Sequence, residues 1–335
     1  MLTATPLAEH IYFLLCPDFS MIAFTMALEP LRLANRMAGE PRYRWELISA
    51  DGKPVMASNG VEVAVPKSMA AVQRECLGPV RSRMVIVCSG VDVEKVSTPS
   101  ILAWLRRMHA QGAGIGGVCT AAWILAEAGL LDGKRCAIHW ENLPGFAERF
   151  PSANVKSVLF EADGDVFTCA GGTAALDMML HLIGDSLGPD IVARVCEQCL
   201  IDRIRDPGDR QRLPLGARVG AQNEKLLAIV ELMEANIGEP VRLVDMSRTT
   251  GLSRRHVERL FRKHMGRSPA RYYLDVRLER ARRLLRHSGM PVVEVAVATG
   301  FVSASHFSKR YRERYEVSPQ ADRREAEAGL MQPAH

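Results

Sequence analysis

LVDMSRTTGLSRRHVERLFRKHMGRSP, residues Leu243–Pro269, returns in altered form as VVEVAVATGFVSASHFSKRYRERYEVSP, residues Val292–Pro319. The two copies align Gly251 with Gly300 and share a terminal Ser-Pro, with one residue inserted in the second turn. Each copy predicts an apolar helix, a turn centred on glycine, and a second helix with basic residues on one face. This is the outline of a helix-turn-helix unit, and two in tandem predict a DNA-binding domain.

The second helix of the first copy is amphipathic. Ser253 is expected to cap it, while Val257 and Phe261 lie on one face at i, i+4 spacing. Arginine can bond guanine bidentately in the major groove, and glutamate can accept a hydrogen bond from the cytosine amino group. The residues predicted to contact DNA carry those groups and are Arg254, Arg255, Glu258, Arg259 and Arg262.

The second copy offers shorter or more adaptable side chains around an inward Phe307 and Tyr311. Its predicted DNA contacts are Ser303, Ser305, Ser308, Lys309 and Arg312. We therefore expect the second copy to make fewer contacts with bases and more contacts with phosphates than the first copy. Pro269–Leu285 predicts one long helix between the copies, which would place the two recognition helices about one helical turn of DNA apart. The alternative is a basic helical bundle that binds protein.

The charge of the 335-residue chain is unevenly distributed. From Ala221 onward there are 21 Lys+Arg and 14 Asp+Glu, a balance of +7, against 22 and 24 in the rest. A basic C-terminal module fits binding to a polyanion, although a solvated basic face has the same composition. The chain shows no secretory signal, no apolar run of the ~20 residues that span a bilayer, and scattered cysteines. We expect a cytoplasmic protein that does not bind membranes.

Short apolar runs alternate with amphipathic stretches in the first part of the chain. Buried strands are predicted at His10–Cys16, Tyr43–Ala50, Met84–Cys88, Gly114–Val118, Val155–Phe160 and Val166–Ala170. Helices are predicted at Ser20–Arg36, Ile101–His109, Ala121–Ala128, Leu176–Leu187 and Pro189–Ile201, and a hairpin turn at Asn59-Gly60. This alternation predicts a flavodoxin-like α/β domain with a parallel sheet. We expect this domain at 1–201, a linker at 202–222 that is rich in Arg, Asp, Pro and Gly, and an all-α tandem helix-turn-helix domain at 223–325.

Cys119 stands between a short strand and a helix start rich in small residues, in the order Gly117-Val-Cys119-Thr-Ala. Such a turn presents its side chain over the sheet edge, as in a nucleophile elbow. A helix N-terminus would lower the pKa of a thiol there, and His139 at the end of the next strand would lie near it. A working Cys–His pair also needs an orienting carboxylate, which the spacing does not identify. The elbow is either a nucleophile or a fold feature without turnover, and we favour the second reading, with no catalytic residue.

Two glycine-rich stretches resemble ligand-binding motifs but also have structural explanations. Gly112–Gly117 fits G-x-G-x-x-G, but a predicted helix precedes it instead of a strand, so we expect no nucleotide cofactor. Ala170–Thr173 predicts a strand end, a tight turn and a helix cap, whose N–H groups could bind a carboxylate. Close packing of the helix on the sheet would explain the same glycines. Cys196 and Cys199 lie in a predicted helix without a second pair, so we expect no metal site.

The C-terminal part, from about Asn223 to Arg323, resembles the AraC/XylS family of transcription regulators. GLSRRHVERLFRKHMGRSPARYY, RLERARRLL and GFVSASHFSKRYRERYEVSP follow the family pattern in order. One departure is Ser247, where the first helix of the family usually has alanine; Ala296 keeps that alanine in the second copy. The resemblance implies binding to double-stranded promoter DNA and contact with RNA polymerase.

The N-terminal part resembles the PfpI/class I glutamine amidotransferase-like fold that heads one branch of these regulators. PDFSMIAFTMALEPLRLANR, GVCTAAWILAEAGLLDGKR, HWEN and AGGTAALDMMLHLI carry the resemblance. Enzymes of that fold usually follow the elbow cysteine with histidine, where this chain has Thr120, and Ile22 stands about where their carboxylate lies. Both departures argue against catalysis. Regulators of this branch sense small metabolites such as glycine betaine, carnitine or arginine, and switch on catabolic operons.

Because the doubled helix-turn-helix unit is joined to an elbow-bearing domain, we expect a ligand-responsive transcriptional activator that works as a homodimer. The small-molecule effector is expected to bind at Glu29, Cys119, Thr120, Trp123, His139, Trp140, Gly172 and Thr173. Among these, a carboxylate and two indole rings would suit a cationic nitrogen. The alternative function is a PfpI-type cysteine amidase or peptidase that carries a DNA-binding domain.

Overall fold

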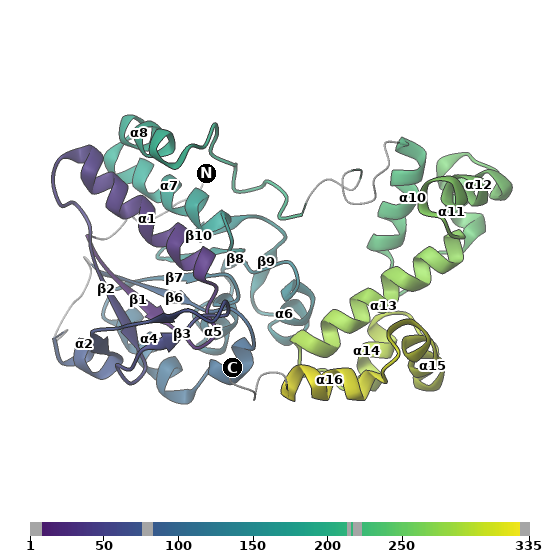
Figure 1. Ribbon diagram of the computed structural model, residues 1–335, viewed down its shortest axis with the longest axis horizontal. Coiled ribbons are helices and arrows are strands. Elements are labelled where there is room, and N and C mark those ends of the chain that lie inside the picture. The colour runs from purple at the N-terminus through teal and green to yellow at the C-terminus, as the bar shows by residue number, and fades with distance from the viewer. Residues whose placement is uncertain (1–8, 76–82, 213–215, 217–222, 329–335) are drawn as a thin grey trace. The chain divides into compact units, whose positions relative to one another are not determined.

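The computed structural model describes residues 9–75, 83–212, 216 and 223–328. The chain forms two compact units, Met1–Gln211 and Arg212–His335. Figure 1 shows an α/β unit and an all-helical unit. Among the described helices, none combines the length and the apolar composition needed to cross a bilayer.

The α/β unit is built on a seven-stranded sheet with the order β10-β11-β7-β6-β1-β2-β5. Its strands are β1 (His10–Leu15), β2 (Arg44–Ser49), β5 (Lys67–Ser68), β6 (Arg83–Cys88), β7 (Gly114–Val118), β10 (Phe160–Asp163) and β11 (Val166–Cys169). All neighbours pair in parallel except β10 with β11. The predicted flavodoxin-like parallel sheet is confirmed, with one antiparallel strand at its edge.

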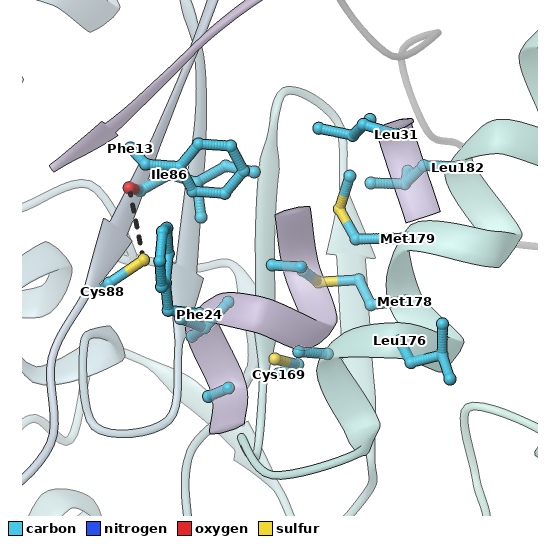
Figure 2. Packing of buried hydrophobic residues seen from close by; sticks show 14 of the residues in the cluster. Phe13, Phe24, Leu31, Ile86, Cys88, Cys169, Leu176, Met178, Met179 and Leu182 are labelled. Atoms are coloured by element: carbon cyan, nitrogen blue, oxygen red, sulfur yellow. Dashed lines mark hydrogen bonds between the residues drawn. The ribbon is translucent and has the colours of Figure 1, made fainter. Parts of the chain in front are cut away.

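Helices cover both faces of this sheet because side chains of a strand alternate between its faces. In β1, Ile11 and Phe13 enter the core under α1 (Met21–Ala38), α7 (Ala174–Leu187) and α8 (Pro189–Cys199), which Figure 2 shows in part. Tyr12 and Leu14 enter the core on the other face. That face is covered by α2 (Met69–Glu75), α3 (Val93–Val96), α4 (Pro99–Ala110), α5 (Ala122–Glu127) and α6 (Leu143–Arg149).

Two small sheets flank the large one. β3 (Val55–Met56) and β4 (Glu62–Val63) form the predicted hairpin, in which Gly60 has a φ of +81°. β8 (Arg135–Ala137) pairs with β9 (Asn154–Lys156). The single strand predicted at Val155–Phe160 is therefore wrong. Its start belongs to β9 and its end to β10, because β10 pairs with β11 across a tight turn at Gly164, where φ is +66°.

The segment after α8 lies along the α/β unit. Arg205 binds Asp177 of α7, the carbonyl of Pro207 accepts a hydrogen bond from the Leu159 N–H, and Gln211 donates to the carbonyl of Ile138. We call residues 205–211 the strap. The first half of the predicted linker at 202–222 is thus fixed on this unit, whereas residues 213–215 and 217–222 lie outside the described residues.

The helical unit consists of two similar halves joined by the long α13, as Figure 1 shows. The first half contains α10 (Glu224–Ala235), α11 (Leu243–Thr250) and α12 (Arg254–Met265), and the connector is α13 (Pro269–His287). The second contains α14 (Val292–Ala298), α15 (Ala304–Tyr315) and α16 (Pro319–Ala328). Each half has its own buried core, around Phe261 in the first and around Phe307 and Tyr311 in the second.

Candidate functional site

The first recognition helix, α12, presents a basic face to solvent. The hydroxyl of Ser253 accepts a hydrogen bond from the His256 N–H and begins the helix, and Gly266 ends it in the left-handed conformation. Val257 and Phe261 are fully buried and fix which face points outward. All five predicted contact residues are exposed, and four of them line a surface recess with Ser253 and His256: Arg255, Glu258, Arg259 and Arg262.

The second recognition helix, α15, has the same construction and a different surface. Ser303 caps it by accepting a hydrogen bond from the His306 N–H, so the hydroxyl of this predicted contact is engaged in the helix cap. Ser305, Lys309 and Arg312 are exposed, whereas Ser308 is half-buried. The surface therefore retains fewer long side chains than α12.

Side chains of α13 hold the two halves at a fixed spacing. Asp275, whose side chain is 12% exposed, forms an ion pair with Arg267 after α12 at 2.6 Å and another with Arg314 on α15 at 3.7 Å. Arg277 donates to the carbonyls of Thr299 and Gly300 in the turn of the second half. Both helix-turn-helix halves are thus tied to the same connector, α13.

Cys119 lies on the predicted elbow between β7 and α5. Its φ of +64° is strained for a residue with a side chain. Its N–H donates to the carbonyl of Cys169, and a Cβ on Gly171 would lie 2.7 Å from the Cys119 Cα and Cβ. Burial raises the pKa of the Cys119 thiol to about 12. The lowered thiol pKa that we expected is wrong, because desolvation outweighs the short helix that follows.

The groups beside Cys119 are tied to the backbone. Thr120 is buried and donates its hydroxyl to the carbonyl of Gly90 at the end of β6. The N–H of His139 donates to the carbonyl of Cys119, and its Nδ1 lies 3.6 Å from a carboxylate oxygen of Glu141. The rings of His139 and Trp140 are 5.6 Å apart. A histidine with a neighbouring carboxylate therefore exists, next to a thiol whose raised pKa disfavours the thiolate that attacks.

Trp123 lies elsewhere. Its indole is 2% exposed and packs edge-on against Phe146 and Phe150, in the core on the α4–α5 side of the sheet. Cys119 instead packs against the core on the α1–α7 side. The structure thus does not bring this predicted ligand residue to the others.

Glu29 and Thr173 are brought together, in a cavity that the sequence did not predict. The cavity has a volume of about 590 Å³ and lies between α1, the start of α7, the end of α8 and residues 201–205. Cys119, His139 and Trp140 are not among its lining residues. The predicted effector residues therefore fall into two groups, one at the elbow and one at this cavity.

Comparison with known proteins identifies the two units. The "Helix-turn-helix domain" model matches residues 246–325, and the "DJ-1/PfpI family" model matches residues 9–185. The transcriptional regulator GbdR of Pseudomonas aeruginosa is 43% identical over 94% of this chain and 84% of its own length. The chain belongs to the AraC-family regulators that carry a DJ-1/PfpI domain.

Other AraC-family regulators match over a similar extent. The P. aeruginosa regulator CdhR is 40% identical over 95% of this chain and 92% of its own length, and ArgR is 34% identical over 98% and 96%. A crystal structure of an AraC family transcriptional regulator from Pseudomonas putida superposes with a TM-score of 0.51 and 29% identity, covering 57% of this chain and 99% of that one. The chain is a DNA-binding transcriptional regulator.

The regulator also has polar groups that our sequence reasoning missed. Asp177 is 4% exposed and accepts hydrogen bonds from the backbone N–H, Nε and Nη2 of Arg205. Arg205 also donates to the Thr173 hydroxyl at 2.7 Å. An aspartate inside a predicted apolar helix was the available signal, since a buried carboxylate requires a partner. Its partner, Arg205, lies in the segment that was predicted to be a linker.

Proposed function

We propose that this regulator activates a catabolic operon in response to a small nitrogenous metabolite of the glycine betaine, carnitine or arginine kind. The observation that carries the proposal is the pair of exposed basic helices, α12 and α15, on one connector in a chain that also holds a DJ-1/PfpI domain. Relatives with both domains are named transcriptional regulators, which supports the same role.

The effector is proposed to bind the α/β domain, at the elbow group or at the cavity group. Cys119, Thr120, His139, Trp140 and Gly172 form the first group, and Glu29 with Thr173 the second; Trp123 is left out because its indole is part of the core. We further propose that the regulator acts in the cytoplasm as a homodimer, that residues 202–222 connect its domains, and that DNA-bound protein contacts RNA polymerase.

A reporter gene behind the DNA upstream of the regulator's own operon tests this proposal. Transcription in cells that contain the wild-type regulator should rise when glycine betaine, carnitine or arginine is supplied, and should not rise in cells that lack the regulator. No response to any of the three metabolites would contradict the proposed effector class.

The second candidate is the cysteine amidase or peptidase, which the His139–Glu141 contact favours and the raised thiol pKa opposes. Cys119→Ala separates the two functions. We expect wild-type protein to hydrolyse neither amides nor peptides. Hydrolysis by wild type that the substitution abolishes would establish the enzyme.

A further inference from the structure

The cavity between α1, α7, α8 and residues 201–205 has the size of a metabolite site. Its volume of about 590 Å³ falls within the range of known small-molecule pockets, about 300–1,000 Å³. Met26, Leu33, Leu176 and Ile201 supply apolar walls. Such a mixture of apolar walls and a few polar groups is typical of pockets that orient a small ligand.

Charges of both signs line the same cavity. The carboxylates come from Glu29, Asp177 and Asp202, and the guanidinium groups from Arg32, Arg36, Arg203 and Arg205. Glu29 pairs with Arg32 at 2.6 Å in a half-exposed ion pair, and Arg36 donates to the neutral amide oxygen of Gln198 at 3.3 Å. A hydrogen bond from a guanidinium to a carboxylate is stronger than one to a neutral amide. Arg36 would therefore bind a ligand carboxylate more strongly than it binds Gln198.

Pro30 leaves one backbone acceptor of α1 without its helical donor. Proline has no N–H, so the carbonyl of Met26, four residues earlier, lacks its regular helical donor. Both residues line the cavity. A carbonyl in this position, with the Glu29 carboxylate in the next turn, suits the positive nitrogen of a ligand.

We propose that this cavity binds a small zwitterion, which places its carboxylate at Arg36 and its cationic nitrogen at Glu29 and the Met26 carbonyl. The inference rests on the proposed effector-responsive function and names the site within it. Neutral sugars do not fit this pairing, because they carry neither a cationic nitrogen nor a carboxylate. Dianionic phosphates do not fit it, because they carry no cationic nitrogen.

The cavity is also joined to the strap. Arg205 lines the cavity and holds Asp177 and Thr173 through hydrogen bonds of 2.5–3.0 Å. The strap then continues to Gln211, whose amide donates to the carbonyls of Ile138 and Val158. Arg205 therefore connects the wall of the cavity to the strap.

Calorimetric titration of the full chain with glycine betaine, L-carnitine and L-arginine tests the site. Glu29→Gln and Arg36→Gln should each weaken binding of the best probe at least tenfold. Glu197→Gln and Arg194→Gln on α8 are the matched controls, because they remove the same charges outside the cavity, and they should change the Kd less than twofold. Unfolding midpoints without ligand should match wild type in all four variants, which shows that they fold.

Two results would overturn the inference. If His139→Ala abolishes binding of the probe while the cavity variants bind as wild type, the effector site is at the elbow and the proposed function stands. If none of the three zwitterions binds at millimolar concentration while the reporter still responds to one of them in a regulator-dependent manner, the cavity does not hold this ligand class. Failure of the reporter itself would instead contradict the proposed function.

Discussion

At the residue scale, the same glycine serves different purposes in the two helix-turn-helix copies. Gly251 and Gly300 both have positive φ, +65° and +74°. A Cβ on Gly251 would meet nothing within 4 Å, whereas a Cβ on Gly300 would lie 2.7 Å from the carbonyl of Ile237 and from the ring of Pro240. Repetition of the sequence predicted both turns, but contacts between the halves are not visible in either copy alone.

We therefore expect Gly300→Ala to destabilise the helical unit more than Gly251→Ala does. The left-handed conformation costs about 1–2 kcal/mol in either variant, and the clash at Gly300 adds about 1–3 kcal/mol. Urea unfolding followed by the helical circular dichroism signal would measure both. All four tryptophans lie in the α/β unit, so their fluorescence should not change. Equal losses in the two variants would contradict the close approach.

For Cys119, the backbone turn could be predicted from the sequence, but the pKa of the thiol could not. The strained turn was predictable from a strand followed by small residues, and its φ of +64° confirms it. Burial of the thiol raises its pKa, and the charge of Cys169 raises it further. Both Cys169 and Gly171, which approaches Cys119 closely, come from a distant part of the chain. The direction of the pKa shift was therefore beyond local reasoning.

We predict that iodoacetamide does not alkylate Cys119 at pH 8. A thiol with a pKa of about 12 is almost wholly protonated at that pH, and the thiolate is the reactive form. Mass spectrometry of wild type and Cys119→Ala after equal exposure should find the same number of modified cysteines. One modification fewer in the variant would show a reactive elbow thiol.

At the element scale, regular periodicity predicted α1, α4, α5, α7 and α8 and the central strands of the α/β unit. The short helices α2, α3 and α6 and the edge strand β5 were not predicted, and the edge strand β10 was mispredicted. β10 is short and lies at the edge of the sheet. Its position is set by contacts with distant residues, because β10 pairs with β11 and the preceding Leu159 bonds the strap. The long connector α13 was predicted in outline. Its side-chain partners in both halves were not, because they depend on tertiary contacts.

Asp275 on α13 should position both recognition helices. Asp275→Asn removes the charge that Arg267 and Arg314 share, and we expect a loss of about 1–2 kcal/mol in stability together with a several-fold weaker affinity for DNA. The control is Asp245→Asn, because Asp245 pairs with Arg242 and Arg248 on a single exposed helix end. Urea unfolding and fluorescence anisotropy with labelled DNA give the two quantities. Indistinguishable effects of the two variants would count against the bridging role.

Asp322 on α16 should make the stability of the helical unit sensitive to acid. Burial alone would raise the pKa of this carboxyl, but hydrogen bonds from Tyr311 and Arg282 and the charge of Arg286 hold it below the ordinary value. A lowered folded-state pKa contributes stability that is present above the unfolded-state pKa, about 4, and is lost as pH falls through the folded value.

Thermal unfolding by circular dichroism between pH 7 and pH 3 checks this expectation. Asp322→Asn should be less stable than wild type at pH 7, and the difference should shrink as the pH falls below about 4. Asp245→Asn should follow the wild-type curve. A constant difference between Asp322→Asn and wild type across the range would rule out the titration of Asp322 as its source.

At the scale of the whole molecule, more of the helical unit than of the α/β unit could be predicted from the sequence. The doubled stretch and the charge balance predicted the helical unit and the exposed residues of α12. The effector site depends on which side chains the sheet, α1, α7 and the strap bring together, and the cavity combines residues 26–36, 173–177 and 198–205. No spacing along the chain predicts such a combination.

We expect α12 and α15 to bind promoter DNA. Fluorescence anisotropy of the full chain on the DNA upstream of its own operon measures this binding. Arg259→Ala combined with Lys309→Ala should weaken binding at least tenfold and reduce its salt dependence, since one base-reading arginine and one cation near phosphate are lost. Arg42→Ala combined with Lys53→Ala removes the same charge from the α/β unit and should bind as wild type. Unchanged affinity of the first pair, or an equal loss in both, would contradict the claim.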